Sequence, residues 1–86
     1  MWFSTRLGGV SAPPFDTLNV GRSTADAPEA VTENRRRILS RLGADDGRVA
    51  TAGQVHGAEV SRANSEGLHR ECDALVTTVP GLPIAI

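Results

Sequence analysis

Residues 26–43 read DAPEAVTENRRRILSRLG, and this stretch carries the strongest helix signal in the chain. Asp26 is a candidate N-cap residue, and Pro28 suits the first helical turn because that turn leaves its N–H groups unpaired. Glu29 follows Asp26 by three residues, which is the spacing of a capping box. The pattern predicts a helix that begins near residue 27.

The remainder of the stretch predicts where this helix ends. Apolar residues recur at helical spacing, namely Val31, Ile38, Leu39 and Leu42. The arginines at 35–37 lie mainly toward the C-terminal half, where the helix dipole favours cations. Gly43 suits the left-handed position that follows many helices. We therefore expect one helix over residues 27–42.

Short strand-like runs lie on both sides of the expected helix. These runs are residues 1–5, 18–20, 48–55, 58–62, 74–77 and 83–86. The runs 48–55 and 58–62 are compatible with a hairpin or with one bent strand, and residues 63–71 are polar enough for a loop. One helix among short strands in a chain of 86 residues indicates a single small α/β domain.

The composition excludes several classes of function. The net charge is −1, and the aromatic residues are one Trp and two Phe, so we expect no nucleic-acid surface. No apolar run reaches the ~18–20 residues that span a bilayer, so we expect no membrane partner. Cys72 is the only cysteine, which excludes an internal disulfide. With an N-terminus that lacks the pattern of a secretion signal, this predicts a cytoplasmic protein.

The sequence keeps the pattern of an apolar strand up to its last residues, PIAI at 83–86. A terminal apolar strand needs neighbours along its edges and faces. We therefore expect residues 1–86 to form one partial domain, the first part of a larger α/β domain. Its open sheet edge would allow a second copy or a complementing chain to pair with it.

Four stretches in this order resemble one protein family. They are FSTRLGGVSAPPFDTLNVG at 3–21, DAPEAVTENRRRIL at 26–39, QVHGAEV at 54–60 and DALVTTVPGLPIAI at 73–86. The family is the bacterial laccase-domain proteins, also called polyphenol oxidase or YfiH-like proteins, which are associated with purine nucleoside phosphorolysis and adenosine deamination. The resemblance implies an α/β sandwich of mixed sheets with flanking helices, of which this chain matches the N-terminal part.

The resemblance also implies a metal site. The family's site is similar to a zinc site of two histidines and one cysteine, and its first histidine corresponds to His56. The cysteine and the second histidine follow beyond residue 86, so this chain holds one of the three ligands. Zinc is favoured over copper, because blue-copper sites often add an axial methionine and Met1 is the only methionine. A complete protein would act on a purine nucleoside and phosphate, by transferase and hydrolase chemistry.

His56 is the leading candidate for both catalysis and metal binding. A neutral imidazole suits zinc, and the neighbouring Gly57 would allow the backbone to approach a ligand closely. The alternative is a histidine at a turn that bonds to the backbone, and the resemblance favours the ligand. Gln54 lies two residues earlier, so on a strand it would share the face of His56 and could orient it or contact a nucleobase.

Four further residues are candidates for binding the substrate. Arg6 and Arg35 carry the planar fork that suits phosphate, and Ser4 and Asn19 could hydrogen-bond a ribose. The alternative for Asn19 is a local bond to the backbone, which asparagine forms readily.

The remaining polar residues are expected to have structural roles. Arg36 and Arg37 are interpreted as a solvated helix face or as ion-pair partners. Cys72 is expected to be a small buried residue at the start of a strand, and His69 to be exposed in a polar loop.

Two hypotheses about function remain open at this point. In the first, the chain is the N-terminal part of a zinc-dependent purine-nucleoside enzyme, whose other residues come from a further segment or a second chain. In the second, it is a truncated, non-catalytic α/β domain that acts through self-association or a partner chain. Whether the chain is an enzyme on its own is therefore undecided.

Overall fold

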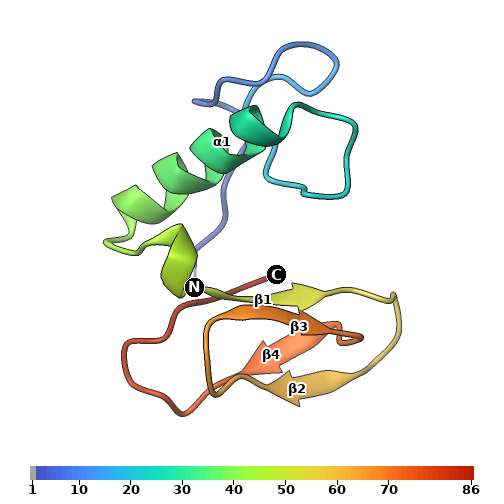
Figure 1. Ribbon diagram of the computed structural model, residues 1–86, viewed down its shortest axis with the longest axis vertical. Coiled ribbons are helices and arrows are strands. Elements are labelled where there is room, and N and C mark those ends of the chain that lie inside the picture. Colours follow the sequence, from blue (N-terminus) through green and yellow to red (C-terminus); the bar gives the residue numbers. More distant parts are fainter. Residues whose placement is uncertain (1) are drawn as a thin grey trace. The chain divides into compact units, whose positions relative to one another are not determined.

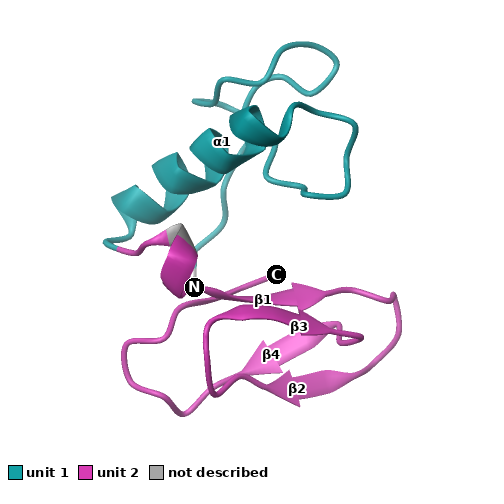
Figure 2. Cartoon of the chain, in the orientation of Figure 1, with its two compact units in different colours: residues 1–43 teal, residues 44–86 magenta. Residues whose placement is uncertain are grey.

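The structure, a computed structural model, describes residues 2–86, apart from the side chain of residue 46. The chain forms two compact units, residues 1–43 (unit 1) and residues 44–86 (unit 2), coloured separately in Figure 2. Unit 1 holds one α-helix and unit 2 holds five short strands, so the predicted α/β class is confirmed (Figure 1). Within the described residues, no helix is long and apolar enough to cross a membrane.

The helix α1 spans Pro28–Arg41, which confirms the helix predicted at 27–42. Its C-terminal end follows the sequence signal, because Gly43 adopts a φ of 70° and its N–H donates to the Ser40 carbonyl at 3.1 Å. The predicted capping box is wrong. Ala27 is the N-cap residue, and the Asp26 carboxylate instead accepts the Ser11 hydroxyl at 2.5 Å.

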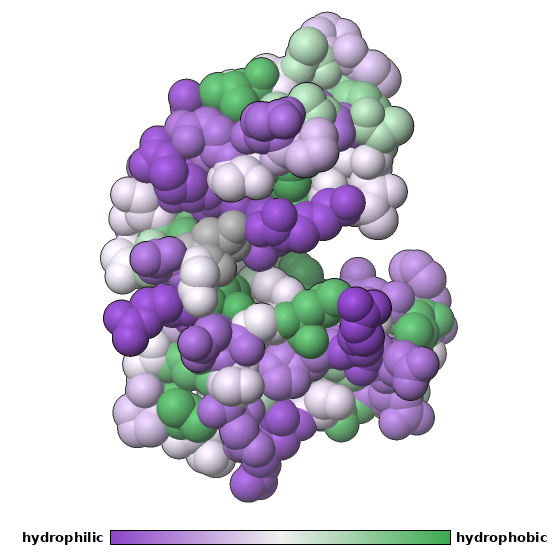
Figure 3. Space-filling view, viewed as in Figure 1, coloured by the Kyte–Doolittle hydropathy of each residue, from purple (hydrophilic) through white to green (hydrophobic). Residues whose placement is uncertain are grey.

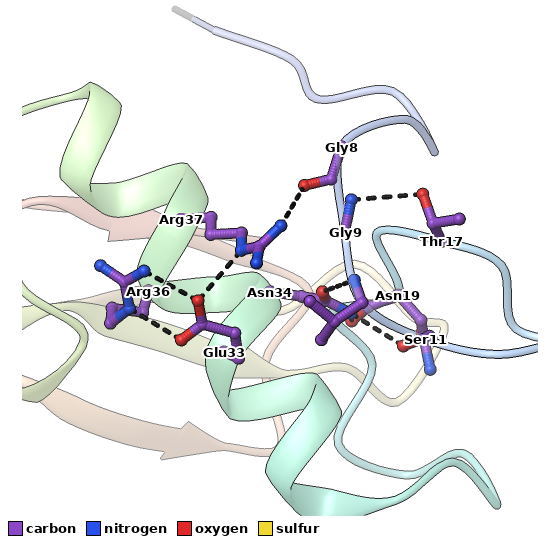
Figure 4. A network of polar contacts seen from close by, with 10 residues as sticks. Gly8, Gly9, Ser11, Thr17, Asn19, Glu33, Asn34, Arg36 and Arg37 are labelled. Atoms are coloured by element: carbon purple, nitrogen blue, oxygen red, sulfur yellow. Dashed lines mark hydrogen bonds and ion pairs between the residues drawn. The ribbon is translucent and has the colours of Figure 1, made fainter.

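The buried face of α1 is centred on a polar side chain, not on a purely apolar stripe. Val31 and Leu39 are buried as predicted, whereas Leu42 is 48 % exposed. Asn34 lies between them and is fully buried. Its Oδ1 accepts the Val10 N–H, and its Nδ2 donates to Ser11 Oγ and to the Asn19 carbonyl, each at 2.8 Å (Figure 4). Asn34 thus fastens the preceding loop to the helix.

The N-terminal segment is irregular, so the strands predicted at 1–5 and 18–20 are wrong, with residue 1 lying outside the described residues. A strand needs a partner for its backbone groups, and residues 2–5 have none in the described part of unit 1. Backbone bonds that close a loop hold the segment together. The Arg6 carbonyl accepts the N–H groups of Thr17 and Leu18 at 3.1 and 2.9 Å.

Two adjacent glycines make this loop possible for different reasons. Gly8 adopts a φ of 95°, a backbone conformation that residues other than glycine rarely adopt. Gly9 lies so close to the backbone of Thr17, across the loop, that a Cβ on Gly9 would lie 2.0 Å from the Thr17 carbonyl oxygen. Arg37 of α1 also donates to the Gly8 carbonyl at 3.1 Å.

Unit 2 consists of two parallel sheets. The strands are β1 (Ala50–Gly53), β2 (Val60–Arg62), β3 (Gly67–Arg70), β4 (Ala74–Val76) and β5 (Ile84–Ala85), preceded by the short 3-10 helix η1 (Asp46–Arg48). One sheet has the order β3-β1-β5 and the other pairs β2 with β4. The chain therefore alternates between the sheets, and each return brings the next strand parallel to an earlier one. This alternation provides the long crossover that parallel pairing requires.

The strands predicted at 48–55, 58–62, 74–77 and 83–86 exist in shorter form, but their pairing differs from the prediction. Both the hairpin and the bent strand are wrong, because β1 and β2 belong to different sheets. The loop predicted at 63–71 is also wrong, since it contains β3. The exposed residues of this strand include both Leu68 and Arg70, and its parallel pairing with β1 explains why it forms.

The core of unit 2 is made of small side chains. It consists of Ala50, Ala63, Cys72 and Leu75, with Ala52 and Leu82 packed against it. Cys72 is fully buried, as predicted. His69 is half-buried in β3, with Nε2 3.0 Å from the Ser65 carbonyl, so its predicted exposure is wrong. Many larger apolar side chains remain at the surface, as the green areas of Figure 3 show.

Replacement of Asn34 tests whether the polar centre of unit 1 stabilises the fold. Asn34→Ala removes one hydrogen bond from the Val10 N–H and one each from the oxygens of Ser11 and Asn19, all at least partly buried, and an unpaired buried group costs about 1–3 kcal/mol. We expect the free energy of unfolding, measured in urea, to fall by about 2–4 kcal/mol. Thr32→Ala, at an exposed position of the same helix, should change it by less than about 0.5 kcal/mol. Equal effects of the two variants would contradict the role of Asn34.

The two kinds of glycine constraint predict different costs for the same substitution. Gly9→Ala forces the backbone away from Thr17, so we expect a loss of more than about 2 kcal/mol in the free energy of unfolding. Gly43→Ala meets open space and has only the strain of a φ of 70°, about 1 kcal/mol. Urea denaturation of both variants checks the order. A cost at Gly43 that matches the cost at Gly9 would show that Thr17 does not approach so closely.

Candidate functional site

The loop between β1 and β2 presents His56, and one carboxylate determines its shape. Asp73, the residue before β4, accepts three successive backbone N–H groups. Its Oδ1 lies 3.0 Å from the nitrogen of Val55 and 2.7 Å from that of His56. Its Oδ2 lies 2.9 Å from the nitrogen of Gly57. Hydrogen bonds to an ionised acceptor are among the stronger ones in proteins, so this loop has a well-defined conformation.

His56 itself adopts a left-handed backbone conformation with a φ of 61° and is exposed. This region costs a residue with a Cβ roughly 1–2 kcal/mol and is normally occupied by glycine or asparagine. The imidazole is therefore placed on the surface by a backbone that its neighbours must hold. The His56 bond to Asp73 runs through its main-chain nitrogen, and the role of its imidazole as a ligand stays a prediction.

The Asp73 carboxylate is fully engaged by the loop. Partial burial raises its pKa, but the hydrogen bonds from Gly57, His56 and Val55 outweigh this and lower the pKa overall. The group is thus an ionised acceptor at neutral pH. Its two oxygens serve the loop, so Asp73 is a support for His56.

Gln54 is exposed and lies just after the end of β1 at Gly53. The expected alternation of side chains along a strand does not apply there, so a shared face with His56 does not follow from strand geometry. Its predicted contact with a nucleobase stays a prediction.

The described residues do not form a metal site by themselves. They contain no group of three His, Cys, Asp or Glu residues arranged to hold an ion. Cys72 is buried, and its thiol donates to the His69 carbonyl at 3.3 Å. His56 is therefore the candidate ligand that this part of the chain offers, and a zinc ion does not fit the described residues alone.

Unit 1 holds the other candidates, and a groove of about 260 Å³ runs beside α1 there. Ser4 lines this groove together with Trp2, Phe3, Arg37 and Arg41. Arg6, Asn19 and Arg35 are not among its described lining residues. Ser4 is thus the unit 1 candidate that lines the groove, and Arg37 and Arg41 line it without having been predicted as substrate contacts.

The side chain of Asn19 is occupied by its own loop. Its Nδ2 donates to Thr24 Oγ1 at 2.9 Å and to Asp26 Oδ2 at 3.1 Å, and its Oδ1 accepts the Gly21 N–H at 3.1 Å. The geometry supports the local alternative considered for this residue. The Arg6 guanidinium, in contrast, is exposed and lies 3.9 Å from Asp16, which is a weak ion pair.

The arginines of α1 divide into two kinds. Arg36 contacts both carboxylate oxygens of Glu33 at 2.8 Å, and Arg37 contacts one of them at 3.0 Å, which confirms the predicted ion pairs (Figure 4). The hydrogen bonds from Arg36 and then Arg37 lower the pKa of Glu33 to about 2. Arg35 is half-buried on the same helix, and its role as an anion contact stays a prediction.

The lowered pKa of the Asp26 carboxylate makes the stability of unit 1 depend on pH in the acid range. The hydrogen bond from Ser11 lowers its pKa, partial burial opposes this, and bonds from Asn19 and Ala27 lower it further. Because the folded pKa is lowered, its contribution to stability is complete above about pH 4 and is lost as the pH falls through the folded value.

Asp26→Asn should therefore lower the stability at pH 7 and flatten its decline below about pH 4. Urea denaturation at pH 7, 4 and 2.5 measures this. Ser11→Ala removes the hydrogen bond that is the largest cause of the lowered pKa of Asp26, so it should also flatten the decline in stability at acid pH. If the decline in stability below about pH 4 is unchanged in both variants, the hydrogen bond between Ser11 and Asp26 does not contribute as described.

Comparisons with known proteins place this geometry in a family. Residues 1–86 match the family described as multi-copper polyphenol oxidoreductase laccase. The chain is 48% identical over 86 residues to a purine nucleoside phosphorylase of Deinococcus radiodurans, covering 98% of this chain and 32% of the relative. It is 42% identical over 85 residues to a purine nucleoside phosphorylase of Mycobacterium tuberculosis, covering 96% and 34%.

Two solved structures have the same fold over this length. YlmD from Geobacillus stearothermophilus superposes with a TM-score of 0.89 at 30% identity, covering 94% of this chain and 34% of YlmD. YfiH from Bacillus licheniformis superposes with a TM-score of 0.84 at 26% identity, covering 92% and 33%. The chain thus spans about a third of the relatives it matches. It belongs to the multi-copper polyphenol oxidoreductase laccase family, with the YfiH-type α/β fold that its motifs predicted.

Proposed function

We propose that this chain supplies the histidine-bearing part of a purine nucleoside phosphorylase. The observation that carries the proposal is the loop 54–57, in which Asp73 holds the backbone so that an exposed imidazole stands on a rigid support. The names of the relatives support the reaction class. Because the chain spans about a third of those relatives, the other catalytic groups come from a further segment or a second chain.

The proposed reaction is phosphorolysis of the N-glycosidic bond. A phosphate oxygen forms a bond to the ribose anomeric carbon, the bond to the purine nitrogen breaks, and the base leaves with that electron pair and takes up a proton. His56 is the residue proposed to be catalytic here, through its imidazole, which would hold the metal described below. The same site would catalyse adenosine deamination, in which water adds to the adenine ring and ammonia leaves.

Substrate contacts are proposed for the polar residues that the sequence analysis named. The exposed guanidinium of Arg6, which lies 3.9 Å from Asp16 in a weak ion pair, would bind phosphate, as would Arg35. Ser4 would bond the ribose, and Gln54 would contact the base next to His56. Asn19 acts indirectly in this proposal, because its side chain shapes its own loop, residues 19–26.

The proposed metal is zinc, with His56 as one ligand and the others from outside residues 1–86. An imidazole is a common zinc ligand. The described residues do not complete a site, so no step of the reaction is assigned to the metal. Copper is less favoured, and Met1, the only methionine, lies outside the described residues.

We propose that both units are parts of one cytoplasmic α/β domain that acts on small molecules and not on nucleic acid or membranes.

A second candidate function is association without catalysis. It is favoured by β3 and β5, the outer strands of their sheet, each of which has one edge unpaired within the described residues. Such an edge can accept a strand from a second copy or a partner.

A chimera tests the proposed function. In it, this chain replaces the matching third of the Deinococcus radiodurans relative. Two reactions are measured, the phosphate-dependent release of hypoxanthine from inosine and the hydrolytic release of ammonia from adenosine. We expect turnover with the chain in place and a loss of at least about 100-fold in His56→Gly, which should fold because glycine accepts a φ of 61°.

His69→Ala is the matched control, since His69 lies within β3 and bonds to Ser65, and it should retain turnover. Bound zinc is measured in the same samples and should be reduced only in His56→Gly. A folded chimera without turnover, together with self-association of the chain on its own, would favour the non-catalytic function.

A further inference from the structure

We propose that Asp73 is the positioning residue for His56, and this inference rests on the proposed function of that histidine. Asp73 is 17 residues away in the sequence, yet its carboxylate bonds to the backbone of His56 and to both neighbours. It therefore acts on the imidazole through the main chain that carries it. Its expected effect is on where the imidazole stands.

The loop forms a small concavity of successive N–H groups, the arrangement known as a nest. Such nests usually bind an external anion. Here the anion is internal, because the two Asp73 oxygens accept the N–H groups of Val55, His56 and Gly57 at 2.7–3.0 Å. The nest is thus not available for substrate phosphate, and its function is to fix the loop.

The left-handed conformation of His56 shows why support is needed. Positive φ is found at turns in Gly43 and Gly81 and at the start of β3 in Gly67, as expected for glycine. Among the described residues, the non-glycine residues with positive φ are His56 and Glu71. A histidine at such a position costs stability that a glycine would not, and residues held this way are frequently at functional sites.

Asp73 is itself held by the core of unit 2. Its N–H donates to the Glu59 carbonyl at 2.8 Å, and the Ala74 N–H donates to the same oxygen at 3.1 Å. The preceding residue, Cys72, is fully buried, and Ala74 pairs with Val60 in the sheet of β2 and β4. A continuous series of contacts therefore runs from the core through Asp73 to the loop. The imidazole is positioned against rigid structure.

The first measurement is the backbone conformation of His56 in the chain itself, by NMR. A residue with positive φ gives a strong nuclear Overhauser effect between its own amide and α protons. We expect this signal in the wild type and its loss in Asp73→Ala. Asp73→Asn keeps the oxygen that serves Val55 and His56 but not the one that serves Gly57, so it should retain part of the signal.

The second measurement is turnover in the chimera described above. Removal of an outer-shell support typically costs about 10–100-fold, and we expect that loss in Asp73→Ala, with partial rescue in Asp73→Asn. Glu71→Gly is the control for stability, because it changes the other described non-glycine position with positive φ and should leave both readouts unchanged.

The outcomes separate the inference from the function on which it rests. An unchanged NMR signal in Asp73→Ala overturns the positioning role, whatever the turnover. Loss of the signal with wild-type turnover also overturns it, while the activity of the chimera still supports the proposed function. Full turnover in His56→Gly overturns the proposed function instead. Loss of signal and turnover in Asp73→Ala, graded in Asp73→Asn and absent in Glu71→Gly, supports the inference.

Discussion

The Asp73 carboxylate, bound to three successive N–H groups, is the interaction on which the candidate site depends. A short loop between strands has few apolar contacts to hold it, so its conformation must come from hydrogen bonds. An ionised carboxylate with two oxygens can satisfy several N–H groups from one point. Asp73 follows the buried Cys72, and its N–H bonds to the Glu59 carbonyl, so Asp73 links the loop that carries His56 to the core of unit 2.

Unit 1 solves the same problem with an amide instead of a carboxylate. Asn34 needs both a donor and an acceptor, because it bonds to the N–H of Val10 and to the oxygens of Ser11 and Asn19. A carboxylate could not donate, and an apolar residue would leave these groups unpaired in a buried position. In a small chain whose core side chains are mostly alanine, valine and leucine, such polar centres determine loop shape.

The sequence predicted what depends on local pattern and failed where the partner is distant. The helix Pro28–Arg41 follows from spacing and from Gly43, and β1, β2, β4 and β5 follow from short apolar runs. The polar strand β3 forms because β1 offers it a parallel edge, which no local pattern encodes. Asp26 looked like a cap, but Ser11, 15 residues earlier, competes for its carboxylate. Asp73 was missed for the same reason, whereas the prediction for His56 came from the QVHG resemblance.

The family description names copper, and the relatives are named for phosphorolysis. A metal site and a nucleoside site would both gain from a histidine whose backbone is ordered before the ligand binds. A histidine in a flexible loop would have to be ordered by the metal or substrate that it binds, at a cost in affinity. Here the cost of the left-handed conformation is met within unit 2, by a carboxylate that belongs to the same unit. The backbone of His56 is therefore held within unit 2 independently of any ligand.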